Sequence, residues 1–406
     1  MGGNMLYGLL CVRLLPVSDY AKFAVLFGYM GSLTMLLDVG MSGTLAPLVG
    51  EQVSNLRLIA DYVASLRKLA LKVYAVFAPV AGVAFIFLVQ RQHWGAVTVT
   101  QMLLVLLCAA WFARISASYG AVLILRRDRD YYYRVQIVGS LGSLGLLVGL
   151  WALHGLNLYV AILLNFGQTL FTATCYYRRA GAVLGVKGHA AKRQEQAIVR
   201  LAVPNVPGAV FYALQGQLML VLITLFGHGV TSIANVGALT RLGQILAFAS
   251  QMNPILLEPY FAKLQAARVK RTYLLTLGLV TAAGTLFTTF AFLFPEVFLW
   301  VLGPKYSQLR LEVGLVILSS AISYVSGCLW VINSARRFVY WWNTLLNIAS
   351  IVVVQALFIW KLDLSTVKGV LLLNIATAIT SLSVMMAGSI YGFVRGPQTI
   401  ERQSAG

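Results

Sequence analysis

Long apolar segments separated by short polar connections make up most of this 406-residue chain. About 20 apolar residues are needed to cross a bilayer core about 30 Å thick, and eleven segments reach that length. They cover residues 20–49, 68–90, 99–125, 134–153, 156–177, 201–227, 231–257, 272–294, 309–332, 341–360 and 366–391. The first fifteen residues, ending at Leu15, match the last part of a twelfth, truncated helix. The pattern predicts an all-α polytopic membrane protein.

The composition agrees with this prediction, because 59% of the residues are hydrophobic, 11% are charged and the mean hydropathy is +0.81. The longest polar connection spans about 178–200 and lies midway between two sets of six helices. We therefore expect an N-terminal six-helix lobe at 1–190, with a linker at about 178–200, and a C-terminal six-helix lobe at 191–406. No connection has room for a soluble catalytic domain.

The formal net charge of +19 is distributed as a topology signal. The connections that follow even-numbered spans, together with the C-terminal tail, contain 22 Lys and Arg residues, whereas the connections on the other side contain 7. The positive-inside rule then places both termini in the cytoplasm. Because membrane topology accounts for the charge, nucleic acid is not expected as a partner.

Motifs for enzymatic or metal chemistry are missing from the sequence. The four cysteines lie in apolar spans without CxxC spacing, which is typical of small core residues. No HExxH motif, Walker loop or GxSxG nucleophile elbow occurs. We therefore expect no catalytic residues, no metal and no cofactor.

Two arginines, Arg114 and Arg241, lie near the middle of predicted spans. A guanidinium at bilayer depth costs about 2.5 to 3.5 kcal/mol on insertion scales, so it normally faces a protein cavity and a partner. Trp111 lies three residues before Arg114 and Ser118 lies four after it, which places an aromatic ring and a hydroxyl on the same helical face. Such a face suits a sugar or a phosphate.

Polar stripes on two further spans suggest additional ligand-binding groups. Arg241 shares a helical sector with Gln244, and Tyr212 shares another with Gln215. Lipid cannot satisfy the hydrogen-bonding groups of these side chains. The sequence therefore predicts a cavity in which these residues, with Arg114, bind an anionic or polar ligand.

Acidic partners for the two arginines are scarce in the spans. Only Asp38 and Glu258 lie within or at the edge of a span, and neither has the same apparent depth as the arginines. This shortage favours an external anion, although pairing of an arginine with a carboxylate stays open. Asp38 is interpreted as either a protonation site for coupling or a salt-bridge partner.

Several motifs resemble those of Wzx-type polysaccharide flippases, which belong to the multidrug, oligosaccharidyl-lipid and polysaccharide (MOP) exporter superfamily. The resemblance begins with the segments 13–20 (RLLPVSDY) and 36–42 (LLDVGMS). It continues at Pro204, at 235–238 (NVGA) and at Pro254 and Pro259, and it ends with the turn at 302–306 (LGPKY). The order of these motifs and the number of spans agree with that family over essentially the whole chain.

The resemblance implies two six-helix bundles around a central cavity, in a protein of the bacterial inner (plasma) membrane. It also implies translocation of a polyprenyl-diphosphate-linked oligosaccharide, a repeat unit of O-antigen, capsule or exopolysaccharide, to the outer leaflet by alternating access. Membrane lipids, a glycan polymerase and other assembly proteins are the implied partners.

Three other readings stay open as alternatives, one of them a transport-dead scaffold for a glycan-assembly complex. A MATE-like drug or cation antiporter would share the fold, but it would be expected to place acidic residues at mid-depth. An integral-membrane glycan polymerase or acyltransferase would need larger outer loops or clustered catalytic groups than this sequence contains.

Overall fold

The computed structural model describes residues 2–50, 52–90, 92, 94–186, 188–203, 206–227, 229–336, 338 and 340–395. All regular secondary structure within these ranges is helical, as the sequence predicted. Nine of the described helices are long and apolar enough to cross a membrane, and one bent helix pair raises this number to ten if it forms a single span. The chain is therefore an all-α polytopic membrane protein.

The helices form two compact units, each described here by itself. The N-terminal unit comprises residues 6–225 and 229–234, and the C-terminal unit comprises 1–5, 226–228 and 235–406. The lobe boundary at 190 stays a prediction, although this division groups residues 191–225 with the N-terminal unit. One reason is that α9 (Val206–Gln215) packs on α2 (Val17–Asp38), where the Ser32 hydroxyl donates to the Ala213 carbonyl at 2.7 Å.

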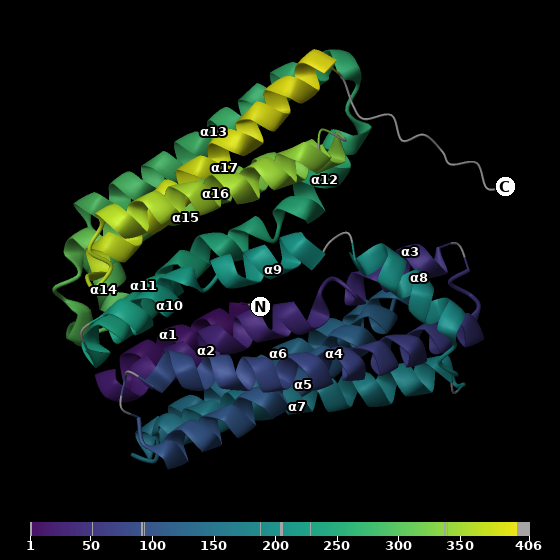
Figure 1. Ribbon diagram of the computed structural model, residues 1–406, viewed down its shortest axis with the longest axis horizontal. Coiled ribbons are helices and arrows are strands. Elements are labelled where there is room, and N and C mark those ends of the chain that lie inside the picture. Colours follow the sequence, from purple (N-terminus) through teal and green to yellow (C-terminus); the bar gives the residue numbers. More distant parts are fainter. Residues whose placement is uncertain are drawn as a thin grey trace. The chain divides into compact units, whose positions relative to one another are not determined.

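The long helices of the N-terminal unit run side by side (Figure 1). Besides α2 and α9, most or all of each of these helices belongs to the unit: α1 (Gly2–Leu14), α3 (Leu45–Val49), α4 (Leu56–Gln90), α5 (Ala96–Leu125), α6 (Arg129–Ala152), α7 (Leu158–Leu184), α8 (Lys192–Ala202) and α10 (Leu218–Phe226). The short α1 is held by Tyr7, whose hydroxyl donates to the Ala161 carbonyl of α7 at 2.6 Å.

The apolar segment 20–49 is not a single helix, so the predicted span is wrong in that respect. Helix α2 ends at Asp38, because Val39 and Gly40 adopt left-handed backbone conformations with φ of 44° and 74°. A short 3₁₀ turn and α3 follow. Hydropathy alone misses this break, since the residues on both sides of it are apolar.

The connection predicted at 178–200 contains the end of α7 and most of α8. Gly185, with φ of 64°, terminates α7 in a left-handed C-cap. Helix α8 is amphipathic: its Ile198 is fully buried, and its Glu195 forms ion pairs with Lys68 at 2.7 Å and Lys72 at 2.9 Å. These contacts fix α8 against α4.

Two further predicted spans are also interrupted. The span 201–227 comprises α9 and α10 with a break after Gln215, whereas Pro204 lies outside the described residues. The span 231–257 comprises α11 (Val230–Ser250) and the start of α12 (Asn253–Lys263).

The C-terminal unit is built around α15 (Arg310–Ala335), which packs against α12, α13 (Ala266–Leu293) and α17 (Val367–Arg395). Helix α14 (Pro295–Leu302), α16 (Trp341–Lys361) and most of α11 complete it (Figure 1). Buried amides crosslink these helices: Asn333 donates to the Met385 carbonyl at 3.3 Å and accepts from the Ser389 hydroxyl at 2.9 Å.

Gly188→Ala should lower the thermal unfolding midpoint of the detergent-solubilised protein. A Cβ at residue 188 would overlap the Ala60 carbonyl of α4, and overpacking of this kind costs about 1–3 kcal/mol. The matched control is Gly181→Ala, whose Cβ would meet no atom within 4 Å and should leave the midpoint no lower. Differential scanning fluorimetry measures both, and equal midpoints would contradict the close approach.

Candidate functional site

The Arg114 guanidinium on α5 forms an ion pair with Asp38 at the end of α2. Arg114 Nη1 lies 2.6 Å from Asp38 Oδ1, and the two side chains are 3% and 25% exposed. The prediction that no carboxylate reaches the depth of this arginine is therefore wrong. The sequence could not show it, because the depth of Asp38 depends on how α2 packs against α5.

The chain reversal after Asp38 holds the carboxylate in place. Asp38 Oδ1 accepts the Ser42 backbone N–H at 3.2 Å, and Oδ2 accepts the Ser42 hydroxyl at 2.7 Å. The left-handed residues Val39 and Gly40 make this return possible. The carboxylate thus has three donors and is oriented before any ligand arrives.

The Arg114 side chain is only partly satisfied by its neighbours. Its Nη1 also donates to the Ser118 hydroxyl at 3.3 Å, as expected for residues four apart on a helix. Its Nε and Nη2 are buried and have no hydrogen-bond partner among the residues that the structure describes. A buried donor without an acceptor costs about 1–3 kcal/mol, so an anion or a carbonyl that reached these atoms would be bound favourably.

Arg241, on α11 of the C-terminal unit, is 4% exposed and has an amide as one partner. Its Nη1 donates to Gln244 Oε1 at 3.2 Å, so the structure brings together two residues that the sequence placed on one helical face. An amide oxygen satisfies a donor without neutralising the charge of the guanidinium.

Tyr212 and Gln215 lie on α9 in the N-terminal unit. Tyr212 is 38% exposed and its ring packs edge-on against Phe211 at 5.4 Å. Gln215 is the last residue of α9, directly before the break that separates it from α10. The predicted role of both residues in ligand binding stays a prediction.

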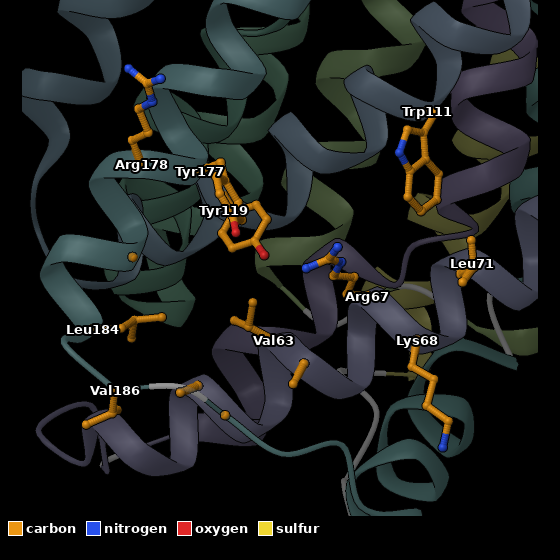
Figure 2. A pocket seen from close by; sticks show the side chains of 14 residues that line it. Val63, Arg67, Lys68, Leu71, Trp111, Tyr119, Tyr177, Arg178, Leu184 and Val186 are labelled. Carbon is orange, nitrogen blue, oxygen red and sulfur yellow. The ribbon is translucent and has the colours of Figure 1, made fainter.

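Trp111 belongs to a pocket that sequence reasoning missed. The centroid of its ring lies 5.2 Å from that of Tyr74 on α4. Trp111 also lines a cavity of about 730 Å³ between α4, α5, α7 and the residues that follow α7 (Figure 2). Arg67, Tyr119, Tyr177 and Arg178 line the same cavity. The two arginines were counted only as topology signals, and no pattern within one helix connects residues of three helices.

The site residues thus fall into four groups: the Arg114–Asp38 network, the Arg241–Gln244 pair, Tyr212 and Gln215 on α9, and the pocket around Trp111. Each group offers donors to an anion or a sugar hydroxyl. Among the described residues, no group of three His, Cys, Asp or Glu side chains is arranged to hold a metal ion.

Comparisons with known proteins support the fold but not a sequence family. No sequence-family profile matches the chain, and no curated protein matches it in sequence. Solved structures match over 97% of the chain. An inward-facing multidrug resistance MATE family transporter of the MOP superfamily has a TM-score of 0.70 at 13% identity, with 93% of its own chain covered.

Two further structures give the same result. An outward-facing multidrug resistance MATE family transporter has a TM-score of 0.61 at 14% identity, with 97% of this chain and 91% of that chain covered. A MOP superfamily transporter from Pyrococcus furiosus has a TM-score of 0.58 at 14% identity with the same coverage, and its description states that a reverse polarity of the binding pocket suggests a different function. The chain therefore has the fold of MATE family transporters of the MOP superfamily.

Proposed function

We propose that this membrane protein is a flippase that moves a polyprenyl-diphosphate-linked oligosaccharide from the cytoplasmic to the outer leaflet of a bacterial inner membrane. The observation that carries the proposal is the burial of a guanidinium near the middle of α5 and of α11. Arg114 and Arg241 are each 4% exposed. Charged groups at such depth are expensive and mark the path of a substrate or an ion.

The chemistry of the substrate matches these groups. A diphosphate accepts forked hydrogen bonds from a guanidinium, whose charge is retained at any physiological pH. The glycan and the diphosphate cannot cross hydrocarbon unaided, whereas the polyprenyl tail is soluble in lipid. The protein therefore needs to shelter only the headgroup. The proposed ligands are Arg241 and Gln244 in the C-terminal unit and, taken separately, Gln215, Tyr212 and the network around Arg114 in the N-terminal unit.

The fold supports a transport cycle by alternating access, because the solved structures include both inward-facing and outward-facing transporters. The fold does not decide the substrate. The transporter from Pyrococcus furiosus, whose description links a reversed pocket polarity to a different function, is a precedent for substrate selection by charge within one fold. Basic residues at mid-helix favour an anionic substrate for this chain.

A drug or cation antiporter is the second candidate, and Asp38 is the observation that favours it. Its carboxylate is a quarter exposed, and it is the acidic group that the antiporter reading would use for coupling. The multidrug transporters with the same fold add weight to this reading. In the flippase proposal, Asp38 instead serves as the coupling group, because its protonation would break the ion pair with Arg114.

Deletion of the gene separates the two candidates. For a flippase, surface glycan should be lost while lipid-linked repeat units still form and accumulate on the cytoplasmic face. Extraction of the lipid-linked units and immunoblotting of surface glycan measure this. Normal surface glycan together with increased sensitivity to cationic drugs would instead establish the antiporter.

Arg241 variants test the proposed contact with the diphosphate. Arg241→Ala should lose most of the transport activity, Arg241→Lys should retain an intermediate share, and Arg241→Glu should be inactive through repulsion. All three should still insert into the membrane: Arg241→Ala relieves an insertion cost of about 2.5 to 3.5 kcal/mol, and Lys or Glu replaces one charge by another of similar cost. Surface glycan per folded molecule is the measurement. Full activity of Arg241→Ala on that scale would remove Arg241 from the site.

A double-mutant cycle on Asp38 and Arg114 separates a structural ion pair from a coupling device. Asp38→Asn should reduce folded yield more than Arg114→Gln, because it leaves a guanidinium that is 3% exposed without its carboxylate, and breaking a buried pair costs about 3–5 kcal/mol. The double variant should recover part of the yield.

Activity of that double variant gives the decisive result. If Asp38 couples transport to a proton, Asp38→Asn/Arg114→Gln should be folded but inactive in the surface-glycan assay. A double variant with wild-type activity per folded molecule would show that the pair is only structural.

A further inference from the structure

The pocket around Trp111 is positively charged and has no acidic lining residue. Fourteen residues line it, and none of them is Asp or Glu. Arg67 on α4 and Arg178 on α7 form no ion pair within the part of the chain that the structure describes. A third cation, Lys68, is engaged elsewhere: its side chain points toward α8, where it pairs with Glu195 at 2.7 Å (Figure 2).

Two tyrosines, one on α5 and one on α7, lie beside the guanidinium of Arg67. The Arg67 guanidinium interacts electrostatically with Tyr119, and it points toward the tyrosines in the pocket (Figure 2). Tyr119 packs edge-on against Tyr177 with ring centroids 5.1 Å apart. One tyrosine acceptor leaves most of the five guanidinium N–H groups of Arg67 available to a ligand. Arg178 follows Tyr177 directly in α7 and supplies a second positive charge at the edge of the pocket, with its guanidinium pointing away from Arg67 in Figure 2.

The rest of the lining is apolar and extends toward the middle of the helices. Leu71 lies one turn along α4 from Arg67, and Trp111 lies two turns before Tyr119 on α5. At 1.5 Å per residue, the pocket follows α4 for about 16 Å from Ala60 to Leu71. Leu71 is 55% exposed, so the apolar end opens outward. A ligand with a phosphate at one end and hydrocarbon at the other matches this gradient.

The end of the pocket near Ala60 is closed by the residues that follow α7, without any ligand. The residues after α7 return to α4, where the His189 backbone N–H donates to Asp61 Oδ1 at 2.7 Å. Gly188 lies so close to Ala60 that a side chain would overlap the Ala60 carbonyl. The volume of about 730 Å³ lies within the range of about 300–1,000 Å³ that is typical of small-molecule sites.

We infer that this pocket binds the phosphate-bearing headgroup of an anionic membrane lipid, with Arg67 and Arg178 as the charged ligands and Leu71 and Trp111 in contact with an acyl chain. The positive-inside distribution assigns this end of α4 and α7 to the cytoplasmic face, whose leaflet is rich in anionic lipid. The inference is independent of the transported substrate, because none of these contacts involves Arg241 or the Arg114–Asp38 pair.

Equilibrium binding of radiolabelled phosphatidylglycerol to the purified full-length protein in nonionic detergent tests the inference. Arg67→Gln/Arg178→Gln should weaken binding by about tenfold or more, because each basic residue contributes to the attraction of an anionic headgroup. Gly181→Trp should weaken it to a similar extent by filling the pocket, since a Cβ at residue 181 meets no atom within 4 Å. Arg67→Lys should retain more affinity than Arg67→Gln.

The matched control is Arg193→Gln/Arg200→Gln, which removes two exposed charges from α8 outside the pocket. It should change the affinity by less than about twofold. The lipid assignment is overturned if this control loses as much affinity as the pocket variants, or if both pocket variants bind like the wild type. It is also overturned if phosphatidylcholine or inorganic phosphate competes as well as phosphatidylglycerol. Gel filtration and an unchanged unfolding midpoint without lipid verify that each variant is folded.

Discussion

A charge inside hydrocarbon must find its compensation within the protein, and the ion pair between Arg114 and Asp38 meets this requirement in the N-terminal unit. The pair joins α5 to the end of α2 at 2.6 Å. It needs the carboxylate at the end of a helix, which is where α2 stops, and the left-handed residues after Asp38 turn the chain so that Ser42 supplies two more donors. The break in the first long span is therefore part of the charge-pairing arrangement.

The same requirement applies to backbone groups and explains where the helices are interrupted. Irregular backbone at membrane depth is tolerated only where it is buried in protein or lines a polar cavity. The turn after Asp38 satisfies this condition through the Asp38 carboxylate. Gln215 ends α9 just before a second break, and Ser32 of α2 anchors α9 through the Ala213 carbonyl. Polar groups of neighbouring helices thus accompany both interruptions.

Charge and fold carry different information about function in this protein. Transporters with this fold include multidrug exporters and one whose pocket polarity is described as reversed, so the helical arrangement is compatible with more than one substrate class. Asp38 pairs with Arg114, whereas the Gln244 side chain contributes a neutral amide oxygen to Arg241. The lipid site proposed at Arg67 uses none of these residues.

The sequence by itself determined the membrane class, nearly all of the long helices and the helical face that Arg241 shares with Gln244, because hydropathy and the helical repeat are local properties. It did not determine the break after Asp38, since Val39 is apolar and only its backbone conformation interrupts the span. Only the tertiary structure decided the partner of Arg114, because Asp38 is 76 residues away in sequence. The pocket around Trp111 likewise depends on the packing of α4, α5 and α7, since no periodicity along one helix records which side chains of other helices lie opposite it.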